Sequence, residues 1–120
     1  METIMYQAKA MMTKMPTCDN HLYMLGLLQE EAGELQGKFN KAVRKGLVKF
    51  NDNQMIFSGN FEEQMQFEEE CRKELGDVCW AVAGICEVFG WELADVMQSN
   101  LDKLADRNKR GVIIGEGDNR

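Results

Sequence analysis

Apolar residues recur along most of this chain at steps of three and four, which is the spacing of one face of an α-helix. The first such segment covers about residues 3–14 and ends before Pro16, the chain's only proline. A second segment begins near Asp19, a suitable N-cap residue, and continues to about residue 45, before Gly46. Both segments are therefore predicted to be helices.

The same spacing predicts two more helices in the second half of the chain. One begins after Asn60 and reaches about Phe89, before Gly90, and the other covers about residues 91–108. The residues expected to face the core are Leu22, Leu25, Leu28, Ala32, Leu35 and Phe39 on the second helix, Leu75, Val78, Val82, Ile85 and Phe89 on the third, and Leu93, Val96, Met97, Leu101 and Leu104 on the fourth.

Two segments lack a sustained period. Residues 46–60 are predicted to be a loop, which could include a short hairpin around Asn51–Asn53, and the chain offers little support for a larger sheet. The tail, residues 111–120, contains three glycines and is expected to be irregular or partly ordered by a partner. The prediction is therefore a single all-α domain with four helices.

Length and composition add a limit on the core. A chain of 120 residues with 44% apolar content suits one domain with a modest core, so a subunit interface would add burial. No signal peptide or membrane span is visible. The four cysteines form no CxxC pair, and the single histidine cannot complete a zinc set by spacing. We therefore expect reduced cysteines in a cytoplasmic protein.

The charge balance bears on the choice of partner. Twenty acidic and fourteen basic residues leave a formal net charge of −6, which argues against binding to a nucleic-acid polymer or an anionic membrane. A nucleotide remains compatible with this charge, because a divalent metal can reverse the local field in an acidic site.

Two acid pairs are the main candidates for chemistry. The second helix carries the first pair, Glu31 and Glu34, and the third helix carries the second pair, Glu74 and Asp77. The two residues of each pair are three positions apart and therefore share a helix face. Either pair alone is more simply a solvated face. Two pairs embedded in apolar stripes, each with a glycine inside the motif, favour a site where four carboxylates hold a divalent cation. An all-oxygen ligand set points to Mg²⁺, with Mn²⁺ as the other candidate.

A cationic stripe follows on the fourth helix. Asn100, Lys103 and Arg107 lie at steps of three and four, and Arg110 extends the stripe. These side chains could bind the phosphates of a metal-bound nucleotide. The three cations are equally well explained as charges that complement the C-terminal end of the helix dipole, although Asn100 is not.

The motifs and their order resemble the MazG-like nucleotide pyrophosphohydrolases of the all-alpha NTP pyrophosphatase superfamily. The resemblance rests on an EExxE motif, an ExxD motif and a following Asn-x-x-Lys-Leu-x-x-Arg. The segments that carry it are GLLQEEAGEL from Gly26, KELGDVCWAVAGICEVFGWELADV from Lys73, NLDKLADR from Asn100 and the tail RGVIIGEGDNR. Together they cover most of the chain.

This resemblance implies a four-helix MazG-like bundle that forms a homodimer or tetramer, binds magnesium and cuts a nucleoside triphosphate between its α and β phosphates. The products would be a nucleoside monophosphate and pyrophosphate. It implies that Glu30 orients or deprotonates the attacking water. The implied metal ligands are Glu31, Glu34, Glu74 and Asp77, and the implied phosphate-side residues are Asn100, Lys103 and Arg107.

The chain departs from the family pattern in one respect. Thirty-nine residues separate Glu34 from Glu74, which is more than is common in this family, and the excess falls in residues 47–60. This loop could alter base selection or oligomer packing. Together with the lack of an unambiguous general base, it leaves open a noncatalytic helical module that binds metal or nucleotide.

Overall fold

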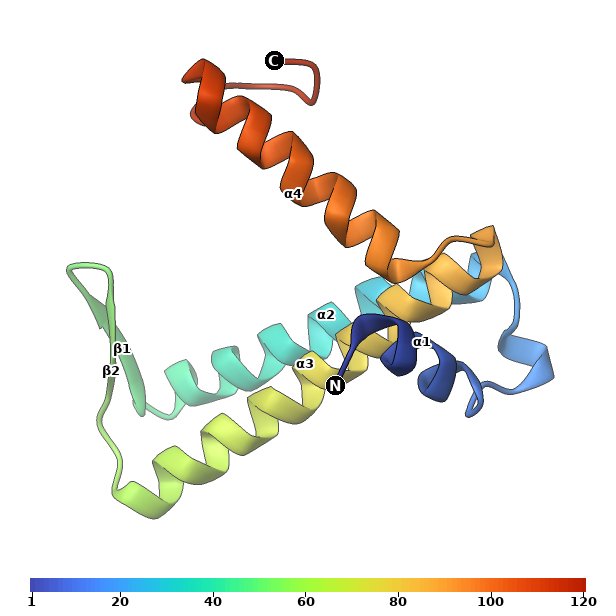
Figure 1. Ribbon diagram of the computed structural model, residues 1–120. Helices are drawn as coiled ribbons and strands as arrows, with labels where there is room; N and C mark the ends of the chain where they lie inside the picture. Colours follow the sequence, from blue (N-terminus) through green and yellow to red (C-terminus); the bar gives the residue numbers. More distant parts are fainter.

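The computed structural model describes all 120 residues and is mostly helical, as predicted (Figure 1). Four α-helices are joined by one short 3-10 helix and one β-hairpin. In chain order the elements are α1 (Thr3–Met11), η1 (Pro16–Cys18), α2 (His21–Arg44), β1 (Val48–Asn51), β2 (Gln54–Phe57), α3 (Phe61–Phe89) and α4 (Leu93–Arg110).

The antiparallel pair of long helices α2 and α3 forms the centre of the molecule (Figure 1). Met24 on α2 is fully buried against Gly84 on α3, where an added Cβ would lie only 3.0 Å from the Met24 Cε. Glycine at this position therefore lets the two helices approach closely. Towards the hairpin, Phe67 of α3 contacts Phe39 of α2 edge to face, with ring centroids 5.2 Å apart.

The ends of the long helices are set by local side chains. Asn20, and not the predicted Asp19, caps α2, because its side chain accepts a hydrogen bond from the Tyr23 backbone at 2.8 Å. Asn60 and Glu63 form a reciprocal capping box at the start of α3. Helix α3 ends, as predicted, at Phe89 and is capped by Gly90, whose φ of 74° is in the left-handed region that favours glycine.

The short hairpin that the sequence allowed around Asn51–Asn53 is present, and its strands extend over most of the segment predicted as a loop. Strands β1 and β2 pair in antiparallel register from Val48↔Phe57 to Asn51↔Gln54. Asp52 and Asn53 form the turn with positive φ values of 48° and 65°, the geometry of a tight hairpin turn. Val48 is buried with Phe67, which attaches the hairpin to α3.

Helix α1 packs against both α3 and the start of α4. Ala10 and Met11 of α1 form a buried cluster with Ala83 and Cys86 of α3 and with Leu93. The buried Gln7 side chain accepts a hydrogen bond from the Leu93 backbone N–H at 2.7 Å and donates one to the Trp91 carbonyl at 2.9 Å. Because α4 has no side-chain cap of its own, Gln7 satisfies its first turn from a distant part of the chain.

Beyond its first turn, α4 diverges from the α2–α3 pair, so one chain does not close into a four-helix bundle (Figure 1). The prediction that an apolar stripe of α4 faces the core is wrong for most of its residues. Leu93 is buried, but Leu101 is 59% exposed. The other members, Val96, Met97 and Leu104, are also exposed. Four other residues that were expected in the core are exposed as well: Leu22 and Leu25 on α2, and Leu75 and Phe89 on α3.

The overall dimensions agree with this open arrangement. The radius of gyration is 17.9 Å, whereas a compact chain of this length would have about 14 Å. Only 13 of 120 residues are buried, so the core of a single chain is small. None of the helices combines the length and apolarity that a membrane crossing requires.

Candidate metal centre

Three acidic side chains meet where the middle of α2 faces α3. Glu31 comes from α2, and Glu74 and Asp77 come from α3, where their spacing of three places them on one face. One carboxylate oxygen from each residue lies within 4.8 Å of the corresponding oxygens of the other two. Packing of the two helices therefore gathers oxygen ligands that are far apart in the sequence.

The electrostatics of Glu31 are unusual for a surface helix. Its Oε2 atom is buried and has no hydrogen-bond partner. Burial, followed by the negative charges of Glu34 and Asp77, raises the pKa of the Glu31 carboxyl from 4.5 to about 7. A buried oxygen without a partner among other carboxylates is the situation that a divalent cation relieves. The donor set, all carboxylate oxygen, fits Mg²⁺ or Mn²⁺.

Lys38 is a neighbour of this cluster that the sequence reasoning missed. Its Nζ lies 3.8 Å from Oε1 of Glu74, and both side chains are partly buried. On α2, Lys38 follows Glu34 by four residues and Glu31 by seven, so the helical period that linked the acids also placed a cation on their face. Lys38 partly offsets the negative charge that Glu74 brings to the cluster.

The remaining acids of the first motif lie further out. Glu34 is exposed and is not among the three residues whose oxygens gather, although its charge acts on Glu31. Glu30 is also exposed. The metal-ligand role expected for Glu34 and the water-orienting role expected for Glu30 stay predictions.

An apolar groove adjoins the acidic cluster on the side of α1. It has a volume of about 390 Å³ and is lined by Met1, Thr3, Tyr6, Val78, Cys79, Val82, Leu93 and Met97. Val78 and Cys79 directly follow Asp77 on α3. Burial, and then the nearby Cys79 and Asp77, raise the pKa of the Tyr6 hydroxyl, so the charge of one clustered acid acts on a residue that lines the groove. The sequence reasoning assigned Tyr6 no role, because a lone tyrosine in a helical stripe carries no signal.

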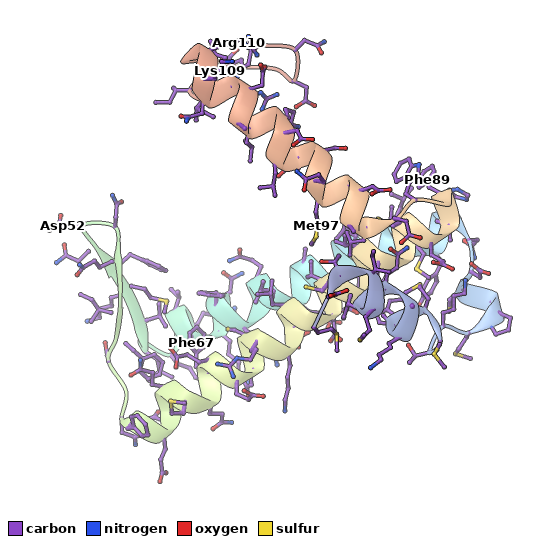
Figure 2. All side chains as sticks on the ribbon, viewed as in Figure 1. Asp52, Phe67, Phe89, Met97, Lys109 and Arg110 are labelled. Atoms are coloured by element: carbon purple, nitrogen blue, oxygen red, sulfur yellow. The ribbon has the colours of Figure 1, made fainter.

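The predicted cationic stripe is not beside the acids of its own chain. Asn100, Lys103, Arg107 and Arg110 all lie on α4, whose far end, with Lys109 and Arg110, stands apart from α2 and α3 (Figure 2). Asn100 is exposed. The Arg110 Nε donates to Asp106 at 2.8 Å. Nζ of Lys103 and Nη2 of Arg107 each lie 3.2 Å from Oδ1 of Asp118, in the tail.

Comparison with known proteins identifies the family of this chain. The model of the family described as the MazG nucleotide pyrophosphohydrolase domain matches residues 19–112. The Gene 37 protein of Mycobacterium phage L5 is 38% identical over 90 residues, which cover 75% of this chain and 68% of that protein. No solved structure matches the chain. The family match includes both acid pairs and all of α4.

Proposed function

Because the chain belongs to the MazG nucleotide pyrophosphohydrolase domain family, we propose that it hydrolyses a nucleoside triphosphate to the monophosphate and pyrophosphate in a magnesium-dependent reaction. The observation that carries this proposal is the cluster of Glu31, Glu74 and Asp77, whose carboxylate oxygens lie within 4.8 Å of one another. The buried, unpartnered Oε2 of Glu31 supports a cation at this cluster.

We assign a role to each acidic residue of the two motifs. Glu31, Glu74 and Asp77 hold the metal, and Glu34 completes the ligand set from the same face of α2. When bound, magnesium supplies neutralisation of the triphosphate charge and makes an attacking water easier to deprotonate. Glu30, one residue before Glu31 and exposed to solvent, orients this water or accepts its proton.

The phosphate contacts belong to α4 in this proposal. Lys103 and Arg107 provide positive charge and several N–H donors, and Asn100 and Arg110 extend the same stripe. Because α4 carries these groups away from the acids of its own chain, a complete site requires α4 to approach an acidic cluster in another copy. The homodimer or tetramer implied by the family resemblance would satisfy this requirement.

The exposed apolar side of α4 supports such an assembly. Four apolar side chains of this helix are at least 40% exposed in the single chain: Val96, Met97, Leu101 and Leu104. Exposed apolar side chains that gather on one helix are unfavourable in water, and another copy that covers them would enlarge the small core. The nucleoside part of the substrate would occupy the apolar groove at Tyr6, next to Asp77.

Release of pyrophosphate tests the reaction. A panel of canonical and modified ribo- and deoxyribonucleoside triphosphates is incubated with the protein in the presence of magnesium, of manganese or of a chelator. We expect pyrophosphate and the monophosphate to appear only with metal. Release of single phosphate, or release that the chelator does not stop, would contradict the proposed reaction.

A noncatalytic module that binds a nucleotide is the second candidate. Two observations favour it. The hairpin between α2 and α3 lies in the segment that makes the spacing of the acid pairs unusual for the family. The only histidine, His21, packs edge to face on Phe89 with ring centroids 4.5 Å apart and is not part of the acidic cluster, so it is no general base there. Calorimetry distinguishes the two functions. Tight magnesium-dependent binding of a nucleotide that the protein leaves intact would favour the module.

A further inference from the structure

The C-terminal tail is folded back beside the end of α4 (Figure 1). The Arg120 guanidinium donates to the carbonyls of Val112 at 3.1 Å, Ile113 at 3.1 Å and Gly117 at 2.6 Å. Gly111 and Gly117 allow the reversals with φ values of 72° and 79°. Residues 112–120 are therefore a closed loop and not a loose end.

Asp118 in this loop contacts the cations that we assign to phosphate binding. Its Oδ1 accepts hydrogen bonds from Lys103 Nζ and from Arg107 Nη2, both at 3.2 Å. The Asp118 carbonyl accepts a further bond from the same Arg107 Nη2 at 2.8 Å. The hydrogen bonds from Lys103 and Arg107 hold the pKa of the Asp118 carboxyl below its ordinary value, so it is an anion at neutral pH.

The burial of the two partners is very different. The Arg107 side chain is 6% exposed, whereas the Asp118 side chain is 83% exposed. The Arg107 Nε is buried and has no hydrogen-bond partner, so the fork of donors on this guanidinium is only partly used. An exposed anion therefore already holds the Nη2 donor of a buried cation whose donors are not all satisfied, and a phosphate that binds this donor has to replace the Asp118 carboxylate.

We propose that residues 112–120 are an autoinhibitory tail, in which the Asp118 carboxylate occupies the position of a substrate phosphate at Lys103 and Arg107. A phosphoanion such as triphosphate or pyrophosphate displaces it. The inference rests on the proposed function, because that function assigns both cations to phosphate. The ion pair of Lys103 with Asp118 is exposed and therefore weak in water, whereas a phosphate brings more charge and more acceptor oxygens to the same donors, so exchange favours the phosphate.

Binding of inorganic pyrophosphate tests this competition. Calorimetry is done with a chelator present, so that metal at the acidic cluster does not contribute. We expect Asp118→Asn to bind pyrophosphate about two- to fivefold more tightly than the parent, because it removes one exposed competitor. Lys103→Gln should bind it more weakly. The matched control is Glu116→Gln, which removes the same charge from the same loop without touching Lys103 or Arg107, and it should bind like the parent.

Three outcomes would overturn the proposal. If Asp118→Asn binds pyrophosphate as the parent does, the carboxylate does not compete. If it binds more weakly, Asp118 positions the two cations for the ligand. If neither protein binds pyrophosphate, the stripe is not a phosphate site. Circular dichroism of each variant verifies that the helices are intact.

Limited proteolysis supplies a second readout that does not depend on a variant. We expect pyrophosphate to speed cleavage of the parent protein after Glu116 by a glutamyl endopeptidase, because the loop leaves α4 and becomes more accessible. Slower or unchanged cleavage at Glu116 would contradict displacement. Neither measurement involves turnover, so a chain that hydrolyses no nucleotide can still have a displaceable tail, and an active chain can lack one.

Discussion

Glu31 on α2 and Asp77 on α3 bring carboxylate oxygens within 4.8 Å of each other, together with an oxygen of Glu74. The charge of Asp77 is one of the causes that raise the pKa of Glu31 to about 7, after burial and Glu34. Two like charges in a partly desolvated place are unfavourable without a cation, so this pair is the feature that most directly tests the proposed metal centre.

Removing either carboxylate charge should stop the reaction. We expect Glu31→Gln and Asp77→Asn to lower magnesium-dependent pyrophosphate release by at least about a hundredfold, since the metal and its water would no longer be held. The matched control is Glu68→Gln, an exposed acid on α3 outside the cluster. Both variants should stay helical by circular dichroism. Activity at the parent level in both would show that the acidic cluster is not the active site.

The pKa of Glu31 predicts how stability depends on pH without metal. Its pKa is about 7 in the folded chain and 4.5 ordinarily, so between these values the folded state binds more protons than the unfolded state. Stability should therefore fall as pH rises from 4.5 to 7, and the loss should be complete above 7. Melting temperatures with chelator measure this trend, and magnesium should reduce it. If Glu31→Gln retains the same slope, another group causes it.

Close approach of the long helices should depend on Gly84. A Cβ there would overlap the Met24 side chain, so we expect Gly84→Ala to lower the free energy of unfolding by about 1–3 kcal/mol. Gly76→Ala is the control, because nothing lies within 4 Å of a Cβ at that helical position, and it should stabilise by up to about 1 kcal/mol. Urea unfolding measures both. A neutral Gly84→Ala would mean that the helices move apart without cost.

Gln7 should hold α4 onto the rest of the chain. We expect Gln7→Leu to lower the free energy of unfolding by about 1–3 kcal/mol, because the Leu93 N–H would lose its buried acceptor. Gln36→Leu is the control: Gln36 is exposed and bonds only to Asn40 on the same helix. Faster hydrogen exchange at the start of α4 should accompany the first change. Equal stability of the two variants would exclude this role for Gln7.

The exposed stripe of α4 should be an interface between copies. We expect the parent to have a molar mass that is a multiple of the 13.7 kDa chain, and Leu101→Glu to shift it towards a single chain, because a buried charge opposes association. Ser99→Glu, about half a turn away on α4, is the control and should leave the mass unchanged. Light scattering after gel filtration measures all three. A parent protein with the mass of one chain would contradict the assembly.

The sequence by itself determined the elements and the local pairs. Helical periodicity, Pro16 and Gly90 located the helices to within a few residues, and the run Asn51–Asn53 indicated the hairpin turn. The spacing of Glu74 and Asp77 placed both on one helix face. These features depend on backbone geometry over a few residues, which each sequence pattern specifies directly.

Only the tertiary structure decided which groups meet. Glu31 gathers with Glu74 and Asp77 while Glu34 does not, because the contact of Met24 with Gly84 and the packing of α2 on α3 set how the helix faces meet. The direction of α4 also depends on distant contacts, such as that of Gln7 with Leu93. Periodicity marks an apolar face, but it does not specify whether the same chain or another copy covers that face.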